Sequence, residues 1–168
     1  MQPTLYIMCG LAFSGKSTLA KVVAKHTGAT LVGQDAIWFE QLEQAKQTGK
    51  EPTYLSVLGL SKSKVAEALA QGQSVVFDNT NAGRSHRKEF RQIAKEHNAK
   101  AIIVYANTSD DEIKSRQEAN KVTKHRHDPS ESDMQTVRDH FEPPTQAENV
   151  VEYLPSDNLA DWLKNLPS

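Results

Sequence analysis

The stretch GLAFSGKST, residues 10–18, stands between an apolar run and a segment with helical spacing. The apolar run, TLYIMC at 4–9, is typical of a buried strand in a parallel sheet. After the stretch, Leu19, Val22 and Val23 repeat at the spacing of one helix face. The sequence therefore predicts a glycine-rich loop that connects a buried strand to a helix.

This loop matches G-x-x-x-x-G-K-S, the phosphate-binding P-loop, in the strand–loop–helix setting that the motif requires. Gly10 and Gly15 let the backbone approach an anion, and successive N–H groups at the helix start attract phosphate. Lys16 is expected on the β- and γ-phosphates, and Ser17 is expected to bind Mg²⁺. Thr18 either supports the turn or contacts the α-phosphate. The predicted ATP site comprises Gly10, Ser14, Gly15, Lys16, Ser17 and Thr18.

A second acidic signal follows another apolar run, VVFD at 75–78. A carboxylate at the end of a buried strand is costly unless it meets a metal, a water or a hydroxyl. Asp78 is therefore expected to hold Mg²⁺ through water or together with Ser17. A role in capping a helix or a turn is the alternative.

Strand-like and helix-like segments alternate along the whole chain. The expected strands are 4–9, 30–35, 74–81, 101–107 and 149–154. The expected helices are 15–26, 36–48, 62–71, 83–97, one after 108–110, 131–141 and 157–165. This alternation predicts a single α/β domain over 1–168, a P-loop kinase-like three-layer sandwich with a five-stranded parallel sheet. The excursions 49–61 and 121–147 are expected to cover the carboxyl ends of the strands, the second as a basic lid.

Composition narrows the class of protein. The 168 residues carry a net charge of −1, which differs from that of a strongly basic nucleic-acid binder. No run of about 18 apolar residues and no secretory signal is present, so we expect a cytoplasmic protein without membrane contact. The single cysteine, Cys9, is expected to be a small apolar residue at a strand end.

The other P-loop classes fit poorly. A GTPase needs Asn-Lys-x-Asp after a strand, and NKVT at 120–123 supplies only the first half in the wrong place. ABC and motor ATPases are larger and carry further signatures. Small kinases, with a P-loop, a short sheet and a basic lid, remain.

Several motifs together resemble the kinase domain of polynucleotide kinases and its zeta-toxin-like and antibiotic-phosphotransferase relatives. The motifs are GLAFSGKST, the acid of VGQD at 32–35, VVFDNTN at 75–81 with Arg84 and Arg87, the basic lid, and FEPPTQAE at 141–148. The resemblance runs from about Leu5 to Glu148, and its D-x-T-N turn and FEPP segment are more specific than the P-loop.

The resemblance implies that Asp35 is the general base that takes the proton from the acceptor hydroxyl. The position also suits this role, because the acceptor must approach the γ-phosphate at the carboxyl end of a neighbouring strand. Asp35 could also serve as the N-cap of a helix that starts at Ala36.

The family's lid places cations over the nucleotide. The resemblance implies that Arg116 and Lys124 contact ATP and that Arg126 stabilises charge on the transferring phosphate. Arg84 and Arg87 either reach a substrate phosphate or anchor the D-x-T-N turn.

One residue departs from the family. Three residues after the base, the phage polynucleotide kinase has an arginine that contacts nucleic-acid phosphate, and this chain has Trp38. Trp38 either stacks on the acceptor or packs in the core. The departure weakens the polynucleotide assignment and leaves the kinase assignment unchanged.

The expected function is transfer of the γ-phosphate of ATP, with Mg²⁺, to a hydroxyl acceptor. A polynucleotide 5′-hydroxyl ranks narrowly first, so nucleic-acid ends are possible partners. A small acceptor such as a nucleoside, sugar or antibiotic is the first alternative, and a regulatory ATPase without acceptor is the second. No obligate protein partner is expected.

Overall fold

The computed structural model describes residues 2–123 and 129–168. Its strands are β1 (Thr4–Cys9), β2 (Thr30–Gly33), β3 (Val75–Asp78), β4 (Lys100–Ala106) and β5 (Val150–Tyr153). Its helices are α1 (Lys16–Thr27), α2 (Gln34–Thr48), α3 (Tyr54–Ala70), α4 (Arg84–Glu96), α5 (Asp110–Thr123), α6 (Glu131–Asp139), the 3-10 turn η1 (Gln146–Glu148) and α7 (Leu159–Lys164). No helix within these two ranges is long and apolar enough to cross a membrane.

All five strands are parallel, in the order β2-β3-β1-β4-β5. The central strand β1 is buried along its whole length, which explains why it contains an almost continuous apolar run. Ile7 of β1 lies opposite Phe77 of β3 and Ile103 of β4. The carboxyl ends of the strands meet at one edge of the sheet, where the P-loop begins.

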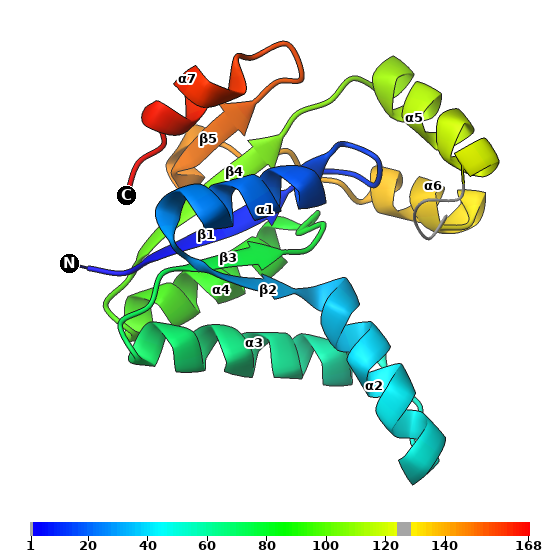
Figure 1. The fold of residues 1–168 in the computed structure, drawn as a ribbon, viewed down its shortest axis with the longest axis horizontal. Coiled ribbons are helices and arrows are strands. Elements are labelled where there is room, and N and C mark those ends of the chain that lie inside the picture. Colours follow the sequence, from blue (N-terminus) through cyan, green and yellow to red (C-terminus); the bar gives the residue numbers. More distant parts are fainter. Residues whose placement is uncertain (1, 124–128) are drawn as a thin grey trace.

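Helices cover both faces of the sheet (Figure 1). Leu19 and Val23 of α1 pack on one face, where α7 adds Trp162. On the other face, α3 and α4 close the core, and the Phe90 ring stacks on Phe77 with centroids 4.0 Å apart. The predicted three-layer sandwich with a five-stranded parallel sheet is confirmed.

Two segment predictions need correction. Strand β2 ends at Gly33 and α2 begins at Gln34, so Asp35 lies in the first helical turn and not at a strand end. The excursion 49–61 is mostly helical, because α3 begins at Tyr54. The Thr53 and Ser56 side chains each cap the other's backbone N–H, and this capping box starts the helix early.

The predicted lid corresponds to α6 and the end of α5, which lie beyond the carboxyl edge of the sheet (Figure 1). Ile113 of α5 and Met134 of α6 form a small apolar cluster with Phe13 of the P-loop. The lid helices therefore rest directly on the phosphate-binding loop.

Candidate active site

The loop between β1 and α1 is shaped for close approach of an anion. Gly10 and Gly15 have φ angles of 151° and 88°, which side chains rarely allow. A Cβ atom on Gly10 would lie 2.9 Å from the Ala106 carbonyl oxygen. The Ser14 hydroxyl is buried and has no hydrogen-bond partner in the described part of the chain. A buried, unpaired hydroxyl beside a helix start fits a phosphate group.

Lys16 and Asp78 form an ion pair at the floor of this site. Lys16 Nζ lies 2.9 Å from Asp78 Oδ1, and the two side chains are only 11% and 16% exposed. Among the described residues, no group of three or more His, Cys, Asp or Glu side chains could hold a metal ion by itself. The Ser17 hydroxyl and the Asp78 carboxylate are hard oxygen donors, which suit Mg²⁺ when phosphate oxygens complete the ligand set.

A cavity of about 630 Å³ opens between α1, α2 and the end of β3. We call it the Asp35 cavity. It brings Lys16, Ser17, Asp35 and Asp78 to one place, as the sequence predicted for a phosphotransfer site. Its lining comprises Ala12, Lys16, Ser17, Thr18, Lys21, Asp35, Phe39, Asp78, Asn79, Thr80 and Pro129.

The end of β3 sets the position of Asp35. Gly33 lies opposite Asp78 in the parallel register, and Asn79 Nδ2 donates to Gln34 Oε1 at 2.9 Å. The N-cap of α2 is Gly33, so the alternative that Asp35 caps this helix is wrong. Within residues 2–123 and 129–168 the Asp35 carboxylate has no hydrogen-bond or ion-pair partner, so it can accept a hydrogen bond from a bound hydroxyl.

A second cavity of about 320 Å³ lies on the opposite side of α1, and we call it the Arg116 cavity. Arg116 reaches the P-loop, because its Nη1 donates to the Phe13 carbonyl at 3.3 Å and its Nε to Glu112 at 2.8 Å. Thr18 lines both cavities, so they meet at the start of α1. The lining comprises Ser14, Gly15, Thr18, Leu19, Val22, Arg116, Tyr153, Pro155 and Leu159.

Sequence reasoning missed three apolar residues of the Arg116 cavity, Tyr153, Pro155 and Leu159. All three lie at or after the end of β5, and ligands of open parallel sheets bind beyond the carboxyl ends of strands. That rule could have drawn attention to this segment. Together with the Arg116 guanidinium, these side chains can hold the flat ring of a nucleotide base.

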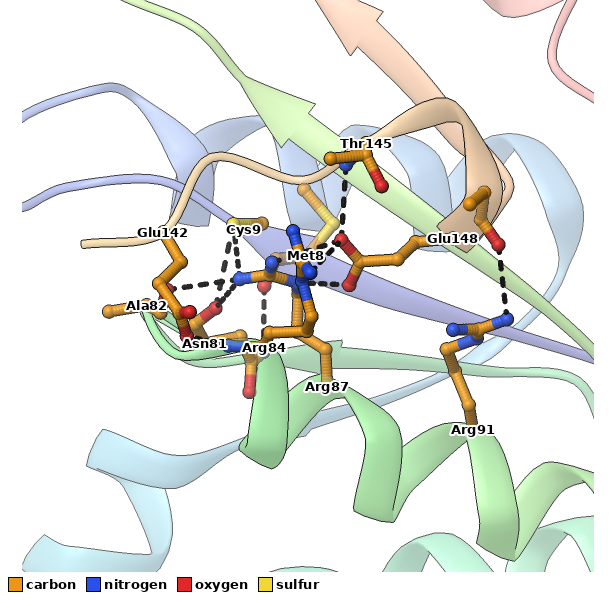
Figure 2. Close-up of polar contacts among 11 residues, drawn as sticks. Met8, Cys9, Asn81, Ala82, Arg84, Arg87, Arg91, Glu142, Thr145 and Glu148 are labelled. Atoms are coloured by element: carbon orange, nitrogen blue, oxygen red, sulfur yellow. Dashed lines mark hydrogen bonds and ion pairs between the residues drawn. The ribbon is translucent and has the colours of Figure 1, made fainter. Parts of the chain in front are cut away.

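Arg87 is fully buried and makes a dense set of contacts (Figure 2). Its Nε and Nη2 donate to the two carboxylate oxygens of Glu148 at 2.9 and 3.2 Å. Its Nη1 donates to the carbonyls of Asn81 and Ala82 at 2.9 and 3.0 Å. This geometry leaves no route to a substrate phosphate, and it favours the alternative that Arg87 anchors the D-x-T-N turn.

The acid and the thiol beside Arg87 respond to burial differently. Burial raises the pKa of the Cys9 thiol to about 12, so the thiol is neutral and suits the expected apolar role. Burial also acts to raise the pKa of the Glu148 carboxyl. Hydrogen bonds from Arg87 and from the Thr145 amide outweigh this effect and leave that pKa lowered.

The sequence profile of the AAA domain family matches residues 5–144, which is most of the chain. The chain belongs to the AAA domain family. The resemblance to polynucleotide kinases and zeta toxins is thus supported at the coarser level of a P-loop domain. A sequence search of curated proteins gave no match.

Solved structures share the fold of this AAA domain. A gluconokinase from Sinorhizobium meliloti 1021 has a TM-score of 0.67 at 22% identity, covering 96% of this chain and 88% of that chain. Kti12 from Chaetomium thermophilum, solved with ADP-AlF3, has a TM-score of 0.74 at 14% identity, covering 95% and 94%. The APS kinase CysC from Mycobacterium tuberculosis, solved with AMPPNP and APS, has a TM-score of 0.63 at 12% identity, covering 97% and 94%. The likeness establishes a P-loop kinase fold.

The remaining predicted residues of the AAA domain lie outside the two cavities. Trp38 is partly buried and packs against the core, whereas its neighbour Phe39 lines the Asp35 cavity. The Arg84 side chain is 58% exposed, and its backbone N–H donates to Glu142 at 2.6 Å. Lys124 and Arg126 lie outside the described residues.

Proposed function

We propose that this AAA domain is an ATP-dependent kinase that phosphorylates a hydroxyl group of a small molecule. One observation carries the proposal: the unpaired Asp35 carboxylate shares a cavity with the P-loop Lys16 and with Ser17 and Asp78. A nucleotide-driven switch needs no carboxylate directed at an acceptor hydroxyl. A kinase requires one in this position.

The proposed roles follow from the geometry. The P-loop amides, Ser14 and Lys16 bind the phosphates of ATP, and the Arg116 cavity holds the base. Ser17 and Asp78 would hold Mg²⁺, which would neutralise charge on the phosphates. Asp35 accepts a hydrogen bond from the acceptor hydroxyl. It takes the proton as the hydroxyl oxygen bonds to the γ-phosphorus and the bond to the β-phosphate oxygen breaks.

Two observations favour a small acceptor over a polynucleotide end. The Asp35 cavity, about 630 Å³, falls within the range of small-molecule sites. The gluconokinase and the APS kinase that share the fold are named for small acceptors. The motif resemblance that ranked a nucleic-acid 5′-hydroxyl first has no such support, so that acceptor becomes one arm of the test.

Asp35→Asn is expected to lower the rate of phosphate transfer by about 100-fold or more, because it removes the proton acceptor. Binding of ATP–Mg²⁺ should stay within about twofold of the native value, since Asp35 does not line the Arg116 cavity. Transfer would be measured with labelled ATP and a panel comprising sugars, sugar acids, nucleosides, an aminoglycoside and a 5′-hydroxyl oligonucleotide.

The matched control is Asp161→Asn, an exposed acid of α7 whose replacement should leave transfer unchanged. Equal transfer by Asp35→Asn and native protein would contradict the assigned base. Rapid ATP hydrolysis that no acceptor stimulates would indicate a switch instead of a kinase.

A further inference from the structure

Two side chains of the Asp35 cavity have no role in the chemistry proposed above, Lys21 of α1 and Phe39 of α2. We infer that they form the recognition subsite for the acceptor, and that the acceptor is a small hydroxyl compound that carries an anionic group. This inference rests on the proposed function, since it names the substrate class of the same site.

The helical register places each of the two residues beside a residue of the reaction site. Lys21 lies four positions after Ser17 on α1, and Phe39 lies four positions after Asp35 on α2. Residues four apart share one helix face. Each helix therefore presents to the cavity one residue for phosphate transfer and, one turn further on, one residue with no assigned part in it.

Lys21 belongs to the acceptor side of α1. It lines the Asp35 cavity and is not among the residues that line the Arg116 cavity, to which α1 contributes Leu19 and Val22. A nucleotide whose base occupies the Arg116 cavity is thus directed away from Lys21. The Lys21 ammonium is available for the other substrate.

The charges of the Asp35 cavity indicate what Lys21 can bind. The cavity contains the carboxylates of Asp35 and Asp78, and Lys16 is already paired with Asp78. Lys21 has no ion-pair partner in residues 2–123 and 129–168, so it is the cation of the described lining that no carboxylate neutralises. A neutral acceptor gains nothing from this charge. An anionic acceptor gains an ion pair and is held with its hydroxyl away from Lys21, toward Asp35.

Phe39 supplies the apolar part of the subsite. Its side chain is 55% exposed although the core lies directly behind α2, where Ile37 and Trp38 pack. Within the described lining, Phe39 is the one aromatic side chain in a largely polar cavity. A carbon skeleton or ring that packs on Phe39 would bury apolar area on both partners and orient the hydroxyl.

The test combines binding with turnover. Calorimetry in the presence of AMPPNP and Mg²⁺ would compare carboxylate-bearing compounds with neutral counterparts, for example gluconate with glucitol and glycerate with glycerol. Phosphate transfer from ATP to the same compounds would be measured in parallel. The variants are Lys21→Gln, with Lys25→Gln of the same helix as control, and Phe39→Ala, with the exposed Leu55→Ala of α3 as control.

At least one anionic compound is expected to bind about tenfold or more tightly than its neutral counterpart. Lys21→Gln should remove this preference, raising KM for that compound about tenfold with little change in kcat. Phe39→Ala should weaken both members of a pair alike. Lys25→Gln and Leu55→Ala should behave as the native protein does.

The outcomes separate the two proposals. Transfer to neutral acceptors, with Lys21→Gln equal to native, would overturn the anionic subsite and uphold the kinase. Anion binding that depends on Lys21, without transfer to any compound, would uphold the subsite and count against the kinase. Neither binding nor transfer, in protein that still binds AMPPNP, would overturn both.

Discussion

Gly10 lies at the tightest point of the phosphate-binding loop, between the end of β4 and the Ser14 side chain. A Cβ atom here would meet the Ala106 carbonyl oxygen and Ser14 Oγ, each at 2.9 Å, and the φ angle of 151° is strained for any side chain. Backbone atoms cannot move aside cheaply. The requirement for glycine is therefore both steric and conformational.

Gly10→Ala is expected to lower the free energy of unfolding by about 1–3 kcal/mol and to weaken nucleotide binding. Gly59→Ala is the matched control. Gly59 lies within α3, and a Cβ atom added to it would meet nothing within 4 Å, so alanine there should stabilise by about 0.5–1 kcal/mol. Urea denaturation of both variants tests the contrast, and equal stabilities would contradict it.

Arg87 and Glu148 form a buried pair whose contacts join the D-x-T-N turn to the segment after the lid (Figure 2). The two side chains are 0% and 4% exposed, so removing either leaves an uncompensated charge in the protein interior. The pair thereby ties the position of Asp78 and its turn to the returning chain.

Arg87→Ala is expected to destabilise the protein by about 3–5 kcal/mol. Arg91→Ala, one turn further along α4, removes an exposed hydrogen bond of 3.5 Å and should change stability by less than about 0.5 kcal/mol. Chemical denaturation of the two variants checks the difference. A small effect of Arg87→Ala would contradict the anchoring role.

The lowered pKa of Glu148 adds a pH dependence with a definite sign. The ordinary value is 4.5, so the folded state favours the carboxylate and gains stability above that pH. This stability is lost as pH falls below 4.5 through the folded pKa. The destabilisation caused by Glu148→Gln should accordingly be largest near neutral pH and shrink in acid, as denaturation at a series of pH values would measure.

At the scale of elements, the lid helices and the P-loop form one mechanical unit. The apolar cluster of Phe13, Ile113 and Met134 holds α5 and α6 on the loop, and Arg138 of α6 pairs with Asp110 of α5 at 2.7 Å. Phe13 directly precedes Ser14, whose hydroxyl faces the phosphate site. A displacement of the lid is therefore transmitted to the loop that binds phosphate.

Met134→Ala should loosen this unit. The side chain is 6% exposed, and its truncation should cost about 2 kcal/mol or more of lid packing. Amide hydrogen exchange in α6 is then expected to speed up roughly tenfold or more, with β1 unaffected. Ser132→Ala, on the exposed side of the same helix, is the control. Unchanged exchange in α6 would show that the cluster does not hold the lid.

At the scale of the whole molecule, the sequence sufficed for the strands, the layers and the P-loop. Buried parallel strands read as apolar runs, and Gly10 to Thr18 are contiguous. Contacts between distant segments were not accessible in this way. Arg87 and Glu148 pair over 61 positions, and Tyr153 joins the Arg116 cavity through the strand order.

The choice between Trp38 and Phe39 shows a different limit. The start of α2 at Gln34 fixes which side chains share a face with Asp35, and the sequence pattern had placed that start at Ala36. In an α-helix the residue four positions after Asp35 faces the same way, which is Phe39 and not Trp38. A small error in the boundary and the pull of the family comparison led to the wrong aromatic residue.

Lys16 and Asp78 balance each other's charge over 2.9 Å in a place with little water. A polyanion that takes the lysine leaves the carboxylate without a counter-charge, next to further negative groups. A ligand that brings its own divalent cation satisfies lysine and carboxylate at once. The pair is thus expected to act as a filter, disfavouring the abundant free phosphates of a cell and admitting nucleotides that arrive as magnesium complexes.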